Sequence, residues 1–405
     1  MTNEQDPMLA YNPTNFGTSK LHLLTLPPEL LLHICSYLKA KFVIKTLSQV
    51  CKALNELVKD ESTWRIRVAK RFPKPFPILP ADDVFDWQTA CIEREEKFEL
   101  WCEPEETMDH FTYREEIFAP VDAVHLMKNG QLLASGSRDR YLNLIDVTKL
   151  ESGDPVSVKA SKVESLMDAH KGWIWSLASV GNSLCSGSWD TYIKFWDLNA
   201  PQLQTVNKIK LKSAVLCMHY EEGELFAGGF DKKTYRIDPR TSSIVSEFML
   251  HKKPVLCMVA DEKHVITGGE DETIYVLDRR SNGVLKSINI GSFAMSMCYN
   301  DGQLWVGDKT GHIHLLDPKH GKFDVVQSYE TGQSGKITDL HNTLGAIFSA
   351  STDKTVNVLE PNENPGVISQ LKFDMEAASL SYQDNTLAIG CSNASIGIWR
   401  PKNIS

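Results

Sequence analysis

Three residues in the middle of the chain are of the types that form a nucleophilic catalytic triad. His170, Ser186 and Asp190 could serve as base, nucleophile and orienting carboxylate if folding brought them together. However, aspartates recur at the same place in similar segments that lack the histidine and serine; they are Asp139, Asp231, Asp271 and Asp353. Because one reaction centre would not be copied several times along a chain, this pattern favours a structural role, and we predict no catalytic residue.

No other group of residues predicts catalysis or cofactor binding. The chain contains neither a phosphate-binding loop nor a nucleophile elbow. Its nine cysteines, from Cys35 to Cys391, include no Cys-x-x-Cys pair and have no histidine at ligand spacing, so neither zinc nor a disulfide framework is indicated. We therefore expect no metal, no cofactor and a reducing compartment, the cytoplasm or the nucleus.

Length and composition narrow the class of protein further. With 405 residues, of which 42% are hydrophobic, the chain favours two folded units. A net charge of −9 argues against nucleic acid as a partner, because binding phosphates requires a basic face. No apolar run approaches the length of a membrane span, so we expect a soluble protein, and the polar residues 1–20 predict a disordered tail.

The elements that would position His170, Ser186 and Asp190 come from a repeat of about forty residues. A small-residue turn followed by a short strand returns seven times. The copies end at Asp146, Asp197, Asp238, Asp278, Asp317, Glu360 and Arg400. Only the first step, of 51 residues, is long, and the excess lies in the polar stretch from Glu151 to Glu164. Each copy is typical of four short strands, and the excess predicts a loop insertion in one of them.

This repeat resembles the WD-repeat family over roughly Thr112 to Pro401, most clearly at Phe195-Trp196-Asp197. The resemblance implies an all-β propeller of seven blades, which we place at residues 111–401. It also implies that His170, Ser186, Asp190 and Trp196 form a buried structural tetrad. Because the seventh repeat stops after its third strand, we predict that the preceding segment from Tyr113 to Ala119 supplies the fourth.

Ahead of the repeats, apolar residues at helical spacing predict a small all-α module at residues 21–66. Its order, Leu-Pro-x-Glu-Leu-Leu, Ile-x-x-Tyr-Leu, Leu-Ser-x-Val-Cys-Lys and Asp-Glu-x-x-Trp-Arg, resembles the F-box. The resemblance implies binding to a Skp-type adaptor and, through it, to a cullin and a RING subunit. The candidate adaptor-binding residues, some of which must pack internally instead, are Leu26, Pro27, Ile34, Tyr37, Leu38, Leu47, Val50 and Leu54.

Residues 67–110 read as a linker that contains helix and proline. The four prolines Pro73, Pro75, Pro77 and Pro80 end one helix, and Asp82-Asp83 is predicted to open another that runs to about Trp101. Its expected buried positions are Phe85, Ile92 and Phe98.

The combined resemblance to F-box/WD-repeat proteins implies a non-catalytic function. The chain would be the substrate-recognition subunit of a Skp-cullin-F-box (SCF) ubiquitin ligase, in which the F-box binds the adaptor and the propeller binds the target protein. The alternative is a WD-repeat scaffold that assembles a complex unrelated to ubiquitin.

In propellers of this family, the residue before the turn aspartate and the residues that begin each first strand line one face around the channel. Carried onto this chain, the candidate substrate-binding residues are Arg138, Trp173, Trp175, Trp189, Phe230, Glu270, Phe293 and Lys309. Exposed aromatic clusters mark binding anchors, whereas phosphate recognition uses several arginines. We therefore predict an apolar or aromatic recognition motif that does not depend on phosphate.

Overall fold

The computed structural model describes residues 23–74, 76 and 85–402. The predicted tail at 1–20 and the prolines Pro75, Pro77 and Pro80 lie outside the described residues. The chain divides into two compact units, the first ending at Arg67 and the second beginning at Val68.

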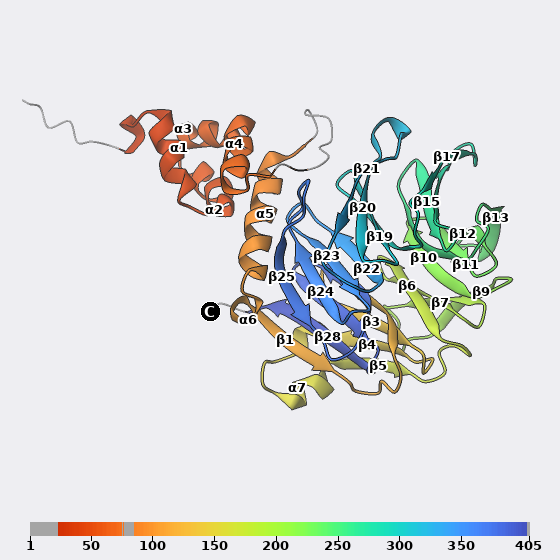
Figure 1. Ribbon diagram of the computed structural model, residues 1–405. Coiled ribbons are helices and arrows are strands. Elements are labelled where there is room, and N and C mark those ends of the chain that lie inside the picture. Colours follow the sequence, from red (N-terminus) through yellow and green to blue (C-terminus); the bar gives the residue numbers. More distant parts are fainter. Residues whose placement is uncertain (1–22, 75, 77–84, 403–405) are drawn as a thin grey trace, which may run out of the picture. The chain divides into compact units, whose positions relative to one another are not determined.

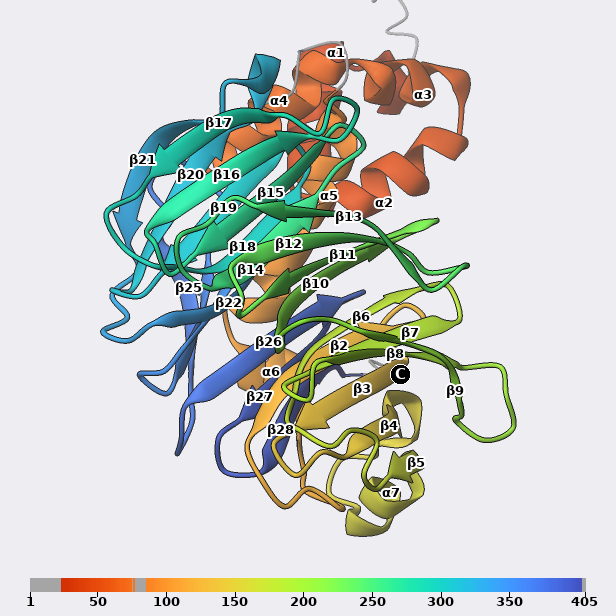
Figure 2. The ribbon, with the colours of Figure 1, turned by 90° about the vertical axis from the view of Figure 1, so that its right-hand side faces the viewer.

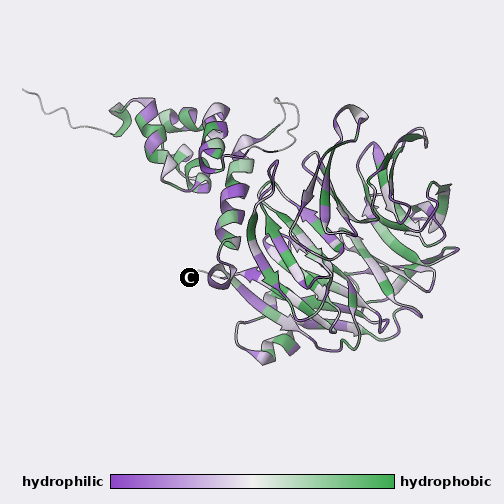
Figure 3. Cartoon of the chain, in the orientation of Figure 1, coloured by the Kyte–Doolittle hydropathy of each residue, from purple (hydrophilic) through white to green (hydrophobic). Residues whose placement is uncertain are grey.

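The first unit is helical and matches the predicted fold class. It contains η1 (Leu23–Thr25), α1 (Pro28–Ser36), α2 (Ala40–Lys45), η2 (Leu47–Gln49), α3 (Lys52–Lys59) and the greater part of α4 (Glu61–Arg71). Hydrophobic and hydrophilic residues alternate along these helices (Figure 3), as expected for short helices around a small core. Trp64 is fully buried, and its indole N–H donates to the carbonyl oxygen of Val58 at 2.7 Å. Arg67 donates to the carbonyl oxygen of Cys35 at 2.8 Å, which joins α4 to the end of α1.

The second unit is a seven-bladed propeller of four-stranded antiparallel sheets (Figure 1), as predicted. Blade one contains β2 (Val121–Met127), β3 (Leu132–Ser137), β4 (Leu142–Asp146) and β5 (Lys162–Leu166). Blade two contains β6 (Ile174–Val180), β7 (Ser183–Ser188), β8 (Tyr192–Asp197) and β9 (Thr205–Lys210). Blade three contains β10 (Val215–Glu221), β11 (Glu224–Gly229), β12 (Lys233–Asp238) and β13 (Ser243–Met249). Blade four contains β14 (Val255–Ala260), β15 (His264–Gly269), β16 (Thr273–Asp278) and β17 (Val284–Asn289).

The remaining blades complete the ring. Blade five contains β18 (Ala294–Asn300), β19 (Gln303–Asp308), β20 (His312–Asp317) and β21 (Asp324–Glu330), with η4 (Lys319–Gly321) between the last two. Blade six contains β22 (Ile337–Asn342), β23 (Ile347–Ser351), β24 (Thr355–Leu359) and β25 (Val367–Lys372). Blade seven contains β26 (Ala377–Gln383), β27 (Thr386–Cys391), β28 (Ser395–Pro401) and β1 (Met108–Tyr113). The first strands of neighbouring blades contact one another from β2 round to β26 and back (Figure 2), which buries both faces of each sheet.

An earlier segment of the chain closes the ring, but it is not the predicted one. The fourth strand of blade seven is β1, paired with β28 from Met108↔Pro401 to Tyr113↔Ile396 (Figure 1). Residues 114–119 instead form the loop into blade one, where the backbone N–H of Phe118 donates to Asp139 at 2.9 Å. The prediction that Tyr113 to Ala119 forms the fourth strand of blade seven was therefore wrong. The hydrogen bond to Asp139 holds Phe118 in blade one, away from the sheet of blade seven.

The predicted insertion in blade one contains ordered structure. It follows η3 (Val147–Lys149) and includes α7 (Pro155–Ala160). Asp154 caps this helix, accepting hydrogen bonds from the backbone N–H groups of Val156 and Ser157 at 2.9 and 3.1 Å. The guanidinium of Arg400 donates to the carbonyl oxygens of Val147 and Leu150 at 2.8 and 2.7 Å, which ties β28 to this region of blade one.

The helix before the propeller begins later than predicted. Helix α5 runs from Trp87 to Trp101, and Asp86 caps it by accepting hydrogen bonds from the N–H groups of Gln88 and Thr89 at 3.0 and 3.1 Å. The predicted start at Asp82-Asp83 lies outside the described residues, and Phe85 and Asp86 precede the helix. Side-chain capping explains the difference. The backbone N–H groups in the first turn of a helix have no acceptor within the helix, and an N-cap aspartate supplies one.

Helix α5 packs against blades six and seven, and the short α6 (Pro104–Thr107) then leads into β1. Trp101 is fully buried, with its ring 5.4 Å from that of Phe348. A Cβ atom on Gly345 would collide with the carbonyl oxygen of Glu93, so only glycine permits this close approach. The linker helix is therefore part of the propeller unit.

Candidate binding surfaces

Blade two contains the group of four residues that resembles a catalytic triad. Nδ1 of His170 lies 3.0 Å from Asp190, and its Nε2 lies 2.7 Å from the hydroxyl oxygen of Ser186. The indole N–H of Trp196 donates to the same hydroxyl at 2.9 Å. Asp190 also accepts hydrogen bonds from the backbone N–H groups of Lys171 and Tyr192 at 2.8 and 3.0 Å. The structure thus brings the predicted tetrad together.

Burial determines what this tetrad can do. The exposed fraction of Ser186 is 0%, so no substrate atom reaches its hydroxyl. Burial lowers the pKa of His170, and the hydrogen bond to Asp190 only partly offsets this. Burial alone would raise the pKa of Asp190, but hydrogen bonds from His170 and the backbone hold it well below its usual range. A neutral histidine and an ionised aspartate therefore join the turn before β8 to the loop before β6.

A second histidine group lies in blade four and was missed. Nδ1 of His251 lies 2.9 Å from Asp271, and its Nε2 lies 2.9 Å from the hydroxyl of Thr267. The spacing of His251 to Asp271 is 20 residues, equal to that of His170 to Asp190, and this spacing was the available signal. The expectation that the other blades lack the histidine was therefore wrong for blade four, where threonine replaces the serine.

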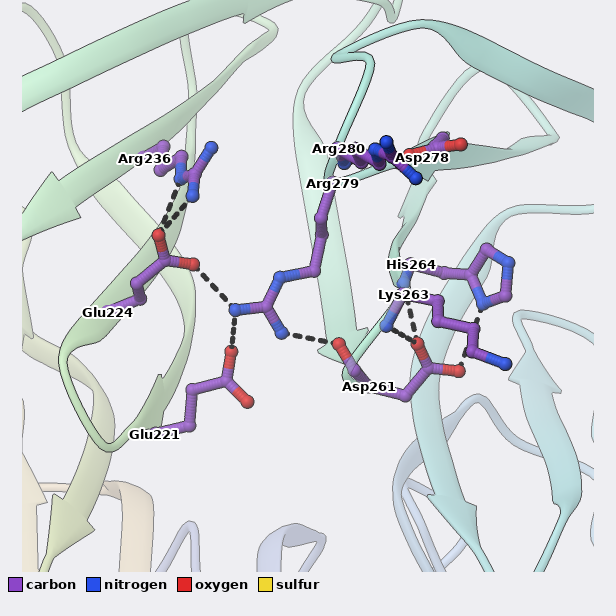
Figure 4. A network of polar contacts seen from close by, with 9 residues as sticks. All are labelled: Glu221, Glu224, Arg236, Asp261, Lys263, His264, Asp278, Arg279 and Arg280. Atoms are coloured by element: carbon purple, nitrogen blue, oxygen red, sulfur yellow. Dashed lines mark hydrogen bonds and ion pairs between the residues drawn. The ribbon is translucent and has the colours of Figure 1, made fainter.

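Charged residues join blades three and four at the C-terminal ends of their first strands, β10 and β14 (Figure 4). The histidine group of blade four lies at the other end of β14. Arg279 extends between the blades and pairs with Glu221 at 2.5 Å and Glu224 at 2.6 Å. Glu224 also accepts from Arg236, and Arg279 donates to the carbonyl oxygen of Asp261. Because the side chain of Arg279 is only 16% exposed and its charge is compensated, this network is a connection between blades and no binding site.

The candidate adaptor-binding residues differ in exposure within the first unit. Tyr37 is 79% exposed, and Pro27, Ile34 and Val50 are also exposed. Leu26, Leu38 and Leu47 are partly buried. Leu54 is 4% exposed and lies in the core of the helical unit, so its side chain is internal packing in this chain. Exposed apolar residues that the sequence prediction omitted are Leu23, Leu24, Leu30, Phe42 and Ile66.

The candidate substrate-binding residues lie on one face of the propeller, which we call the aspartate-turn face. It consists of the turns before the third strands and the loops before the first strands. In every blade a backbone hydrogen bond joins the two, as between the N–H of Trp189 and the carbonyl oxygen of Trp173 at 2.8 Å. The donors in the seven blades are Arg138, Trp189, Phe230, Glu270, Lys309, Thr352 and Ser392. Lys309 donates to Phe293, and its ammonium lies 4.3 Å from the centre of the Phe293 ring.

Four aromatic rings gather on this face across blades two and three. The ring of Trp189 lies 6.0 Å from that of Trp173, 5.8 Å from that of Trp175 and 5.6 Å from that of Phe230. Trp189 is 42% exposed and Phe230 is 52% exposed, whereas Trp175 is half-buried. We call these four residues the aromatic cluster, and it presents a contiguous apolar surface to solvent.

Arg138 borders the aromatic cluster but is engaged on both sides. It donates two hydrogen bonds to the carboxylate of Asp122, at 2.8 and 3.0 Å, and these raise its pKa. Its guanidinium carbon also lies 5.0 Å from the centre of the Trp173 ring. Glu270 is half-buried in blade four. The face therefore brings the aromatic residues together, while its one arginine among the predicted set is already paired with a carboxylate.

The described part of the chain offers neither a membrane-spanning helix nor a metal site. No helix there is both long and apolar enough to cross a membrane. No three histidine, cysteine or acidic side chains there are grouped so that they could hold a metal ion.

Comparison with known proteins relates both units to known families. The F-box-like family model matches residues 23–68, and the WD domain, G-beta repeat model matches residues 161–197. The chain is 40% identical to F-box/WD repeat-containing protein 9 of Homo sapiens over 386 residues, which cover 95% of this chain and 84% of the relative. It is 28% identical to F-box/WD repeat-containing protein mec-15 of Caenorhabditis elegans over 92% of this chain and 95% of the relative. The motif order in the sequence resembles that of F-box/WD repeat-containing protein 9, and the comparison confirms this resemblance.

Proposed function

Because this chain belongs to the family of F-box/WD-repeat proteins, we propose that it is the substrate-recognition subunit of an SCF-type ubiquitin ligase. The helical unit binds a Skp-type adaptor, which connects it to the cullin and the RING subunit. The propeller binds the target protein. Ubiquitination is then accelerated because the target lysine is held at high local concentration near the charged enzyme.

The observation that carries the proposal is the exposed apolar surface of the helical unit. Tyr37, Ile34 and Val50 expose large side chains beside a core that contains only a few buried residues. A unit of this size gains stability by burying such a surface against a partner. Aromatic residues at the centre of an interface commonly contribute most of the binding energy, which makes Tyr37 the main anchor.

The propeller supports the second half of the proposal through the aromatic cluster. Its four rings are held on β6, the turns before β8 and β12, and the loop before β6. Exposed aromatic residues at fixed positions provide contact area at small entropic cost. The proposal includes location in the cytoplasm or nucleus, which fractionation of cells that express the tagged chain tests.

Adaptor binding tests the first half. Ile34→Ala with Tyr37→Ala should weaken capture of a purified Skp-type adaptor by at least about 30-fold, equivalent to about 2 kcal/mol. Leu26→Ala with Pro27→Ala should also weaken it. The matched control is Val206→Ala on β9, an exposed apolar residue of the propeller, which should bind the adaptor like the wild type.

Protein folding is measured on the same samples. Ile34→Ala with Tyr37→Ala, at two exposed positions, should leave the unfolding of the chain unchanged, whereas Leu54→Ala in the core should destabilise the helical unit by about 2 to 5 kcal/mol. Undiminished adaptor capture by both double variants would contradict the proposed interface. Absence of adaptor and cullin from the purified tagged protein would contradict the ligase function and favour the scaffold alternative.

A further inference from the structure

Four lysines that the sequence interpretation did not consider lie on the loops and turns of the aspartate-turn face in blades two, three and four. Lys171 follows His170 in the loop before β6, and Lys232 follows Asp231 in the turn before β12. Lys252 and Lys253 lie in the loop before β14. All four side chains are exposed, and none forms an ion pair with a residue that the structure describes.

Two of these lysines are held in place by the histidine groups. Asp190 accepts a hydrogen bond from the backbone N–H of Lys171 at 2.8 Å, and Asp271 does the same for Lys252 at 2.8 Å. In both blades the aspartate that binds the histidine thus also holds the backbone of the lysine that follows the histidine. The histidine groups of blades two and four therefore each place a lysine directly after the histidine.

The acidic groups of the same region are mostly engaged. Asp190 and Asp271 bind histidine and backbone N–H groups, and Glu247 pairs with Lys212 and Lys233 at 2.9 and 3.1 Å. Glu270 and Glu272 are half-buried, and both lie in blade four. Exposed lysines without an ion pair to a described residue thus remain on this face in blades two, three and four.

The geometry argues for carboxylates in preference to phosphate. A phosphate group is bound best by converging donors, above all by the two-pronged guanidinium of arginine. The guanidinium carbon of Arg138 lies 5.0 Å from the centre of the Trp173 ring, but this guanidinium already donates two hydrogen bonds to Asp122. The free lysines come from three blades, which suits several separate negative charges along a peptide.

From the aromatic cluster and its lysines, we propose that the aspartate-turn face binds an unphosphorylated acidic peptide whose aromatic or large apolar side chain rests on Trp189 and Phe230. Aspartates and glutamates on either side of that anchor pair with Lys171, Lys232 and the lysines of blade four. This inference rests on the proposed function, since it names the class of target segment that the propeller recognises.

A selection with unmodified peptides tests the proposal directly. The full-length chain is immobilised and exposed to a phage library of random twelve-residue peptides, which carry no phosphate. The enriched sequences should contain Trp, Phe, Tyr or Leu flanked by Asp and Glu. No enrichment, or enrichment of neutral or basic sequences, would overturn the proposal.

Binding of the best enriched peptide, labelled with fluorescein, then identifies the residues by fluorescence anisotropy. Trp189→Ala should weaken binding at least tenfold, and Lys171→Ser with Lys232→Ser about three- to tenfold, with a smaller salt dependence. The matched control is Lys128→Ser with Lys263→Ser, exposed lysines at the opposite ends of the first strands. Equal binding by the test and control variants would overturn the assigned site.

Two further measurements separate the possible failures. A version of the peptide with phosphoserine in place of its acidic residues should bind no more tightly than the original, and much tighter binding would mean that the face reads phosphate. Adaptor capture is measured on the same protein. Failure of peptide binding with intact adaptor capture would refute only this inference, whereas lost adaptor capture would count against the proposed function.

Discussion

Replacing Asp190 with alanine should destabilise the propeller by about 3 to 5 kcal/mol. The carboxylate accepts hydrogen bonds from His170, Lys171 and Tyr192, and its side chain is only 9% exposed. Alanine leaves these three donors without their acceptor, and each unsatisfied buried donor costs about 1 to 3 kcal/mol. The total lies below the simple sum because water can reach the edge of the site.

Urea unfolding followed by tryptophan fluorescence measures this effect, since Trp196 belongs to the tetrad and the aromatic cluster adds three further tryptophans to blade two. The matched control is Asp197→Ala in the same blade. Asp197 accepts one hydrogen bond, from the backbone N–H of Asn199 at 2.9 Å, so its loss should cost about 0.5 to 1.5 kcal/mol. Asp190→Asn, which retains one acceptor oxygen, should fall between the two.

The pH dependence provides a second check on the same variant. The pKa of Asp190 is lower in the folded state than in the unfolded state, so its contribution is present above the unfolded pKa of about 3.9. The wild type should therefore exceed Asp190→Ala in stability equally at pH 7 and pH 8, and lose that advantage as the pH falls below about 4. A cost under 1 kcal/mol, or equal costs for Asp190→Ala and Asp197→Ala, would refute the assignment of the tetrad.

The other predictions concern the first strand of blade six and the target site. Asp339 on β22 is half-buried, and the loss of hydration there raises its pKa to about 6 despite hydrogen bonds from the N–H groups of Leu380 and Leu340 at 2.8 and 2.9 Å. The folded state therefore holds the proton of Asp339 more tightly than the unfolded state does. As pH rises from about 4 to 6, the unfolding free energy of the wild type relative to that of Asp339→Asn should fall by about 2 to 3 kcal/mol, and above this range it should stay constant. A pH-independent difference between the two proteins in urea unfolding would contradict this prediction. Target capture by Trp173→Ala with Trp189→Ala should be lost with or without phosphatase treatment, and capture by Arg138→Ala with Lys309→Ala should be largely retained. Loss only in the basic-residue variant, together with sensitivity of the wild type to phosphatase, would show that recognition depends on phosphate.

The ring closure shows where local sequence patterns stop being informative. Residues 113–119 and residues 108–113 adjoin each other, and alternation of apolar residues does not decide which of them pairs with β28. The hydrogen bond from Phe118 to Asp139 and the docking of α5 fix the position of the chain on either side of β1. The choice was thus made by contacts between segments far apart in the sequence.

The same limit applied to the binding surfaces. The F-box resemblance named Tyr37 and Leu54 together, and only packing of the helices exposed the first and buried the second. The propeller columns placed Arg138 beside the tryptophans, but its pairing with Asp122 depends on the register shift between Val121 and Ala123 on β2. This pairing changes a potential phosphate ligand into a compensated charge, which alters the class of peptide that the face favours.

By itself the sequence determined the two units, the seven blades and the residues of the blade-two tetrad. A period of about forty residues and the order of apolar positions in the F-box segment are local properties that every folded arrangement must respect. Tertiary structure decided which strand closes the ring, which F-box side chains face solvent and which charges remain free beside the aromatic cluster. These depend on pairings across blades and helices, whose energies arise from burial and hydrogen bonds between residues that the linear sequence leaves far apart.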